Sequence, residues 1–316
     1  MSLARDGSLG HTRREARRRR PRRVGPPAWV GYAFIAPNLL GLLVFTLIPI
    51  VFAIVVAFSS WTLVSGLSGI QFVGLQNFST ILQDPDFWRS LGHTGEYVFG
   101  SVPLTLAAGL AIALALNGPV PGRNVLRMIF FIPFVANSVA ISATWILLYS
   151  PQYGPIDQIL RSLGLSNPPL WLASSPWAMP ALIIMTIWGG AGYSALIYQA
   201  GLANVPSDLL EAAAIDGARV WSRFSRVVLP FLTPVTFLLV ITNLIATSQT
   251  FGLINLMTQG GPGQSTTVLS YYIYQNAFQF YHFGYAAALA LAMFVLVLLL
   301  ALVLWIGQRR LVYYDA

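Results

Sequence analysis

The chain has 316 residues, of which 56% are hydrophobic and only 9% are charged. Soluble globular chains carry about 25% charged residues, so the composition excludes an ordinary water-soluble enzyme and indicates lipid as the main solvent. All 18 basic residues are arginine, and there is no lysine and no cysteine. These absences exclude a P-loop lysine, a Schiff base, a disulfide and a cysteine zinc site. The three histidines match no metal-ligand spacing, so no metal site is expected.

The net charge of +8 is concentrated at the beginning of the chain, where the first 23 residues hold nine arginines against two acids. We expect residues 1–28 to form a disordered arm whose arginines contact anionic lipid or water. Nucleic-acid binding is the less favoured interpretation of this arm. The apolar stretch that follows, residues 31–58, is far longer than the 7–15 residues of a signal-peptide core, so we interpret it as a membrane span.

Six charge-free apolar stretches are long enough to cross about 30 Å of hydrocarbon. They predict membrane-spanning helices at residues 31–58, 97–116, 128–149, 177–199, 228–250 and 284–306. The sequence therefore predicts an all-α polytopic membrane protein, with one six-span domain over residues 29–316 and no sheet.

The placement of arginine predicts the orientation, because arginine near span ends is retained on the cytoplasmic side. With both termini cytoplasmic, the inner segments hold sixteen arginines and the outer segments hold only Arg89 and Arg161. On the outer side we expect an aromatic-rich interfacial helix around residues 84–88 and a second short helix over residues 157–163.

The longest inner loop covers residues 201–230. Asp208 is predicted to cap a helix over residues 209–216 whose third position is Glu211, and Gly217 to end it in the left-handed conformation. A sharply amphipathic helix follows, so we expect a helix-turn-helix beneath the membrane. Its two sides are formed by Arg219, Arg223 and Arg226, and by Trp221, Phe224 and Val228.

The same loop resembles the EAA loop of permease subunits in binding-protein-dependent ABC importers. The matching residues are Glu211-Ala212-Ala213, Gly217 and Val227-Val228-Leu229-Pro230, with Val227 in place of the usual isoleucine. Asp216 and Ala218 resemble the carbohydrate-uptake class, which includes maltose-type and glycerol-3-phosphate-type systems. Segments 72–78 and 258–278 also resemble this family, and the ending 309–314 resembles the first member of its usual permease pair.

This resemblance implies the type I ABC importer permease fold and a subunit of the bacterial cytoplasmic membrane. In that family two six-span permeases form a heterodimer that encloses the pathway, two ATPase subunits dock on the EAA loops, and an external binding protein delivers the solute. ATP and Mg²⁺ would bind the ATPase, while this chain would bind no cofactor and hold no catalytic residue. The implied ATPase-coupling residues are Glu211, Ala212, Ala213, Asp216, Gly217, Ala218, Arg219, Phe224 and Pro230. A capping role alone remains open for Glu211.

Uncharged polar and aromatic side chains inside the spans indicate a candidate solute pathway, because such groups are costly in lipid unless they are paired or face water. These residues are Asn137, Ser142, Trp188, Tyr193, Asn243, Thr247 and Gln249. Hydrogen bonds between helices are the alternative for each. A neutral sugar or polyol is favoured because no predicted span contains an arginine, with glycerol-3-phosphate and its diesters left open.

The last outer loop is the segment that would face the binding protein, through Gly260, Gly261, Pro262 and Gln264, although a plain flexible connector is the alternative. Two other functions are less favoured. A secondary solute carrier usually needs a carboxylate deep in a span, and a membrane-embedded enzyme needs a cluster of catalytic groups; the predicted spans have neither.

Overall fold

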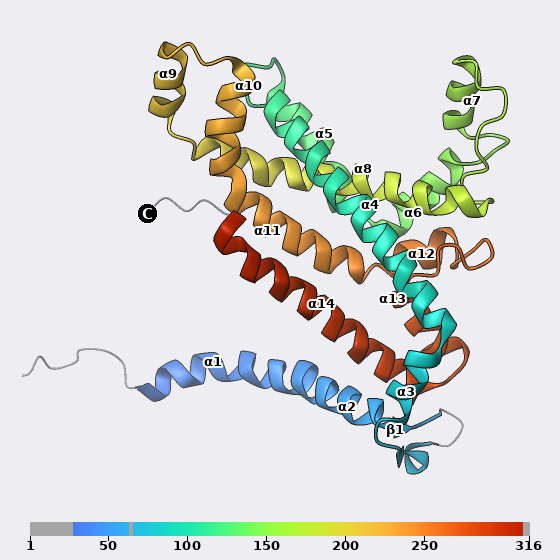
Figure 1. The fold of residues 1–316 in the computed structure, drawn as a ribbon. Coiled ribbons are helices and arrows are strands. Elements are labelled where there is room, and N and C mark those ends of the chain that lie inside the picture. The colour runs from blue at the N-terminus through green and yellow to red at the C-terminus, as the bar shows by residue number, and fades with distance from the viewer. Residues whose placement is uncertain (1–27, 63–65, 312–316) are drawn as a thin grey trace, which may run out of the picture. The chain divides into compact units, whose positions relative to one another are not determined.

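The computed structural model describes residues 28–62 and 66–311 (Figure 1). It comprises two units, Met1–Val51 and Phe52–Ala316. The described part of the first unit contains α1 (Ala28–Leu42), a π-helical turn (Leu43–Leu47) and the beginning of α2 (Ile48–Ala57). These elements continue as one apolar helix, Tyr32–Ala57, long enough to cross a membrane. The arm predicted over residues 1–28 lies outside the described residues except for Ala28.

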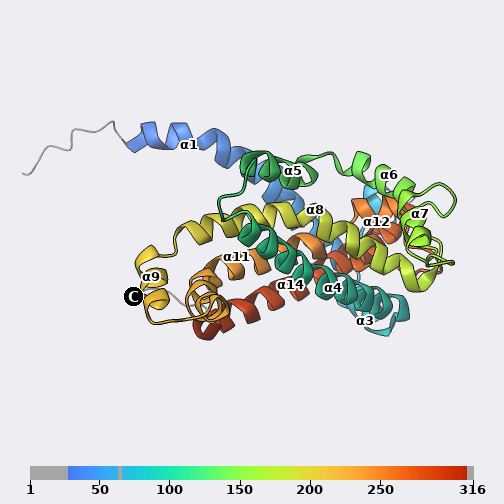
Figure 2. The same ribbon diagram turned by 90° about the horizontal axis from the view of Figure 1, so that it is seen from above.

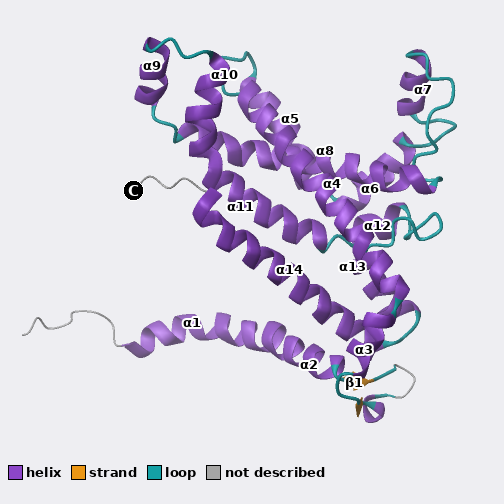
Figure 3. Cartoon of the chain, viewed as in Figure 1, coloured by secondary structure: helices purple, strands orange, loops and turns teal. Residues whose placement is uncertain are grey.

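The second unit is built almost entirely from helices, as Figure 3 shows. They are α3 (Gln76–Gln83), α4 (Pro85–Ala115), α5 (Arg123–Val135), α6 (Ser138–Leu148), α7 (Pro155–Ser162), α8 (Ser175–Ala203), α9 (Ser207–Ile215), α10 (Val220–Arg223), α11 (Leu229–Ser248), α12 (Gly252–Met257), α13 (Leu269–Tyr274) and α14 (Phe283–Leu311). A short 3₁₀ turn, Leu67–Gly69, and two π-helical turns, Phe224–Val228 and Gln275–Gln279, complete the helical elements.

One small sheet departs from the prediction of a sheet-free fold. Strand β1 (Ser59–Ser60) pairs antiparallel with β2 (Gln71–Phe72), with Ser59 opposite Phe72. The pairing joins two residues from each strand, which is too short to produce the alternating pattern by which a strand is detected in a sequence.

Five helices in the described ranges are long and apolar enough to cross a membrane, and the pair α5–α6 makes a sixth if it counts as one span. The two helices of this pair meet at 99°, so the third span predicted over residues 128–149 corresponds to two helices with a sharp bend between them. The chain is extended at Ala136, and Asn137 then starts α6 by accepting a hydrogen bond from the backbone N–H of Val139 at 2.8 Å. An asparagine cap of this kind satisfies amide groups that a helix start leaves free.

Helix α4 begins at Pro85 and not at residue 97, where the second span was predicted to begin. The residues expected to form an interfacial helix at 84–88 are the cap and first turn of α4. Asp84 caps the helix by accepting from the N–H of Asp86 at 2.9 Å, and Pro85 occupies the first position. Hydropathy could not locate this start, because the helix extends past its apolar part through charged residues. The short helix expected at 157–163 is confirmed as α7.

Helices α4, α8 and α11 form the central packing of the second unit (Figure 2). Their shared core buries Leu106 of α4, Tyr198 of α8 and Leu239 of α11. Helix α5 packs on the same α8 at Gly192, where a Cβ atom would lie 1.7 Å from the carbonyl oxygen of Phe130. Glycine is therefore required at this helix crossing.

Gly192→Ala should lower the stability of the folded protein in detergent by about 1–3 kcal/mol or more, because the added methyl group forces α5 away from α8. Gly189→Ala is the matched control, since a Cβ atom there meets nothing within 4 Å. Thermal unfolding of the two variants in the same micelles measures the difference. Equal midpoints would show that α5 does not pack at Gly192.

Candidate functional site

The helix predicted in the inner loop is present as α9, and none of its residues is buried. It ends as expected, with Gly217 in the left-handed region at φ 74°. The N–H of Gly217 bonds to the carbonyl of Ala214 at 3.1 Å, and the N–H of Ala218 bonds to that of Ala213 at 2.9 Å. These two bonds form a Schellman motif, which terminates the helix without help from other elements.

The predicted start of α9 is wrong. The cap position is Pro206, and no side chain caps the helix. Asp208 lies in the first turn, where it accepts a hydrogen bond from the hydroxyl of Ser207 at 3.3 Å. Glu211 is exposed and does not act as a cap. The capping interpretation of Glu211 is therefore excluded, and its side chain lies free at the surface of α9.

The second helix of the loop does not lie separately beneath the membrane. Helix α10, the π-helical turn Phe224–Val228 and α11 continue as one helix, Val220–Ser248, long enough to cross a membrane. Arg219 occupies the cap position of this helix without a side-chain capping bond, and Pro230 lies in the first turn of α11. The inner loop is therefore a short exposed helix joined directly to the end of a span.

An apolar hollow of about 640 Å³ lies between this loop and the end of α4. Its lining includes Leu114 of α4, Leu210 of α9, and Trp221 and Phe224, whose rings are 5.5 Å apart. Arg223 also lines the hollow and has a buried, unpaired Nε, while Arg219 and Arg226 are exposed. The predicted separation of the arginine and aromatic sides is thus wrong at Arg223, which lines the same hollow as Trp221 and Phe224.

The residues predicted to line a solute pathway lie in different surroundings. Trp188 is exposed and packs edge-on against Trp145, with ring centroids 5.5 Å apart. Tyr193 stacks on Phe134 at 4.5 Å. Ser142 is buried, and its hydroxyl has no partner among the described residues.

The remaining predicted pathway residues, three near the end of the fifth span and Asn137, also lie in different surroundings. The amide of Asn243 donates to the carbonyl of Leu239 in its own helix at 2.8 Å, and Thr247 is buried. Gln249 is exposed and lines a hollow of about 290 Å³ with Ile245 and Ile273. Asn137 is occupied as the cap of α6. Of these four residues, Gln249 is the one found both exposed and lining a hollow.

The loop over residues 258–267 lies at the opposite end of the second unit from α9 (Figures 1 and 2). Its threonines tie it together: Thr266 donates to the hydroxyl of Thr258 at 2.8 Å, and Thr267 donates to the carbonyl of Gly260 at 3.1 Å. The interpretation as a plain flexible connector is therefore wrong. The structure separates the segments predicted as inner from those predicted as outer.

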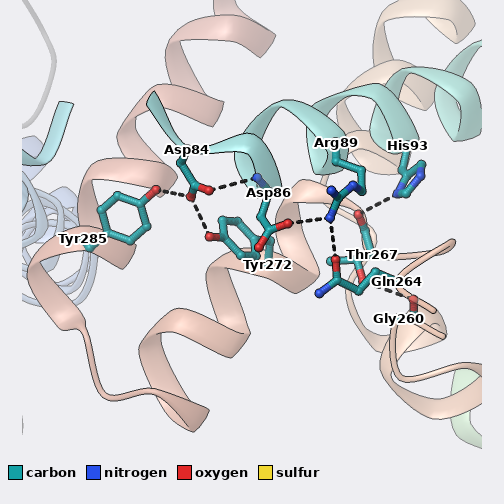
Figure 4. Close-up of polar contacts among 9 residues, drawn as sticks. All are labelled: Asp84, Asp86, Arg89, His93, Gly260, Gln264, Thr267, Tyr272 and Tyr285. Carbon is teal, nitrogen blue, oxygen red and sulfur yellow. Dashed lines mark hydrogen bonds and ion pairs between the residues drawn. The ribbon is translucent and has the colours of Figure 1, made fainter. Parts of the chain in front are cut away.

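Polar side chains along the first turns of α4 hold this loop and the segment after it (Figure 4). Arg89 donates from Nη1 to Gln264 Oε1 at 2.8 Å and to Asp86 Oδ1 at 2.6 Å. His93 Nδ1 lies 3.3 Å from the carbonyl oxygen of Thr267. The result is a polar seam between α4 and the loop.

Asp84 forms the end of this seam. Its Oδ2 accepts hydrogen bonds from the hydroxyls of Tyr272 at 2.6 Å and Tyr285 at 2.5 Å (Figure 4). Partial burial acts to raise the pKa of Asp84, but the bonds from the two tyrosines and from backbone N–H groups outweigh it and hold the pKa below 3.8. Burial, with the bond to Asp84, raises the pKa of Tyr272 to about 12, so this tyrosine stays a donor at neutral pH.

Sequence reasoning missed Asp84 and its two tyrosines. A signal was present, since aspartate followed by proline is typical of a helix cap and first position. The tyrosines had no such signal because they come from distant segments. Within residues 28–62 and 66–311, no three metal-binding side chains cluster.

Comparison with known proteins identifies the family. The family described as binding-protein-dependent transport system inner membrane component matches residues 106–312. This chain belongs to that family.

Individual relatives and a solved structure agree with the assignment. The probable ABC transporter permease protein YesP of Bacillus subtilis (strain 168) is 36% identical over 81% of this chain and 82% of its own length. The trehalose/maltose transport system permease protein MalF of Thermococcus litoralis is 37% identical, covering 81% and 85%. A chain in the crystal structure of a bacterial ABC transporter involved in the import of the acidic polysaccharide alginate has a TM-score of 0.78 and 25% identity, covering 90% of this chain and 96% of that one.

The membership confirms the type I importer permease fold, the carbohydrate-uptake class and the location as a multi-pass inner membrane component. It also confirms that the chain is a transport subunit of an ABC importer and not an enzyme. The comparisons give no support to a secondary carrier.

Asp84→Asn should destabilise the protein at neutral pH, because an amide is a weaker acceptor for the two tyrosines than a carboxylate. The pKa of Asp84 is lower in the folded than in the unfolded protein, so the carboxylate stabilises the fold fully above about pH 4. This stabilisation is lost as the pH falls through the pKa of Asp84 in the folded protein. Melting midpoints of wild type and variant, measured from pH 7 to pH 3, should therefore differ at pH 6 and converge in acid. A difference that stays constant with pH would contradict the role of the charge.

Proposed function

We propose that this chain forms a transport pathway with a second permease, that two ATPase subunits dock on the inner loop, and that an external solute-binding protein docks at the end that holds loop 258–267. ATP and Mg²⁺ bind the ATPase in this proposal. The carrying observation is α9 itself, an exposed helix that buries none of its residues yet is closed by a complete Schellman motif. A helix this short is only marginally stable without packing against another surface, and a cleft on a partner protein would supply that packing.

The surface around α9 fits a protein partner. Glu211 and Asp216 are exposed charges on α9 and its end, and Ala212 between them is small enough to allow close approach. The apolar hollow beside α9, lined by Leu210 and Trp221, adds the kind of desolvated pocket in which interface energy concentrates. The remaining coupling residues, among them Ala213 and Ala218, support the shape of this surface through the Schellman bonds.

The motor must belong to another polypeptide. A P-loop ATPase needs a lysine to hold the β- and γ-phosphates, and this chain has none. The distribution of arginine supports placing α9 and both termini on the cytoplasmic side, where an ATPase has access to ATP. The basic arm would then lie against anionic lipid.

The solute is of the sugar, polyol or glycerol-phosphate type, and the residues favour a neutral sugar. The candidate pathway residues are uncharged, with aromatic rings such as Trp188 and Tyr193 close by. The relative MalF is named for trehalose and maltose transport, which are neutral disaccharides.

The coupling part of the proposal is tested at Gly217. A valine there must adopt φ 74°, which costs about 1–2 kcal/mol or more. In a vesicle-reconstituted complex with the second permease, the ATPase and the solute receptor, Gly217→Val should reduce receptor-stimulated ATP hydrolysis about tenfold. Gly217→Asn is the matched control, because asparagine tolerates the left-handed region. Full stimulation with valine, or sugar accumulation by this chain without the ATPase, would contradict the proposal.

The solute part is tested at Gln249. Gln249→Leu should reduce uptake of trehalose or maltose about tenfold, because the pathway loses an amide that bonds sugar hydroxyls. Asn243→Leu is the comparison, since the Asn243 amide bonds within its own helix and should matter less. Uptake assays with glycerol-3-phosphate in parallel distinguish the two solute classes. Equal losses of uptake in both variants would show that Gln249 has no special contact with the solute.

A further inference from the structure

The loop over residues 258–267, which we call the bracket, is held together by hydrogen bonds between its own residues. Besides the threonine bonds, the N–H of Thr266 bonds to the carbonyl of Gly260 at 3.1 Å, and that of Ser265 bonds to Pro262 at 3.1 Å. Gln264 holds φ 66°, a region that non-glycine residues adopt only when surrounding contacts enforce it. These hydrogen bonds join the first half of the loop to its second half.

The bracket contacts α4 at two points: Gln264 accepts from Arg89, and the carbonyl of Thr267 faces His93 (Figure 4). Just after the bracket, the N–H of Leu269 donates to the hydroxyl oxygen of Thr94 at 2.8 Å. Arg89 and His93 are four residues apart and so lie on one face of α4, and Thr94 follows His93, so the segment runs along the helix surface. A further bond links the loop to α8, from Ser175 to the carbonyl of Pro262 at 3.3 Å.

Arg89 differs from the other outer arginine. It is fixed by two acceptors on either side, Asp86 and Gln264. Among the described residues, Arg161 of α7 donates only to the carbonyl of Pro151, ten residues earlier in its own segment, at 3.3 Å. An exposed ion pair such as Asp86–Arg89 contributes little stability, and the bond from Arg89 to Gln264 is exposed as well, so the role of Arg89 is to position the loop and not to stabilise the fold.

The far end of α4 reaches the inner loop. The helix has 31 residues, which at 1.5 Å each makes it about 46 Å long. Leu114, near its last residue, lines the hollow that Leu210 of α9 and Trp221 share. One unbroken helix therefore contacts the outer bracket at one end and the ATPase-docking surface at the other.

We propose that Arg89 and Gln264 are a positioning pair that passes docking of the external binding protein, through the bracket 258–267, to α4 and from there to α9. The pair does not bind the solute or the nucleotide. This inference rests on the proposed function, because it assumes a receptor on the outer side and an ATPase on the inner side. It deepens that function by naming the helix along which the two are coupled.

The test is receptor titration of the reconstituted complex, with ATP hydrolysis as the readout. Arg89→Ala should lower the maximal receptor stimulation about fivefold while basal hydrolysis and the receptor concentration for half-maximal effect stay close to wild type. Gln264→Glu keeps an acceptor for Arg89 and should retain stimulation. The double variant R89A/Q264G, in which glycine tolerates the loop conformation, should be no worse than Arg89→Ala.

Two controls make the result specific. Arg161→Ala removes the other outer arginine, and Ser175→Ala removes the bond from the loop to α8; both should stimulate as wild type does. A normal maximum in Arg89→Ala, or a normal maximum reached only at higher receptor concentration, would overturn the inference, the latter by making Arg89 a docking contact. Equal loss in Ser175→Ala would also overturn it. A wild-type complex that the receptor does not stimulate would instead refute the proposed function itself.

Discussion

Lipid offers no hydrogen-bond partner to a peptide group, and the rest of this structure follows from that constraint. Every long apolar segment is helical, because a helix satisfies its own amides. The chain departs from regular helix only where a substitute is at hand. At the break between α5 and α6 the side chain of Asn137 replaces a lost backbone acceptor. In the turn Phe224–Val228 the backbone bonds widen without being lost, so α10 and α11 remain one helix.

The same constraint explains why the polar side chains that can bind partners lie at the two ends of the second unit. Polar side chains able to bind partners can be exposed only where water reaches them. The outer end uses them internally, as Asp84 shows by accepting from two tyrosines. The inner end leaves them exposed on α9. The end predicted to face outward therefore uses part of its polar groups within the chain, while the end predicted to face the cytoplasm offers its polar groups to a partner.

Hydropathy and spacing predicted the number of apolar segments and the turn at Gly217, and the resemblance of the inner loop predicted the family, because each depends on residues close together in the chain. They failed where tertiary context decides. The start of α4 at Pro85 was missed because helix can continue through polar sequence outside lipid. The tyrosine contacts of Asp84 join residues about two hundred positions apart, 201 for Tyr285, and no local pattern records them. Arg223 was misplaced because the hollow that it lines is completed by Leu114 of α4 and Leu210 of α9, which a helical projection of its own segment does not contain.

Different kinds of interaction hold the two ends of α4. Hydrogen bonds at the outer end have fixed lengths and directions, so the bracket and the first turns of the helix move together or not at all. At the inner end Leu114 faces Leu210 and Trp221 across an apolar hollow, and apolar contacts have no preferred direction. Packed helices can slide across such a contact by small steps at little cost. The inner half of α4 is itself packed against α8, where a Cβ atom at Gly109 would lie 2.5 Å from the Cβ atom of Ser194, so the proposed coupling would move α4 and α8 together beneath α9.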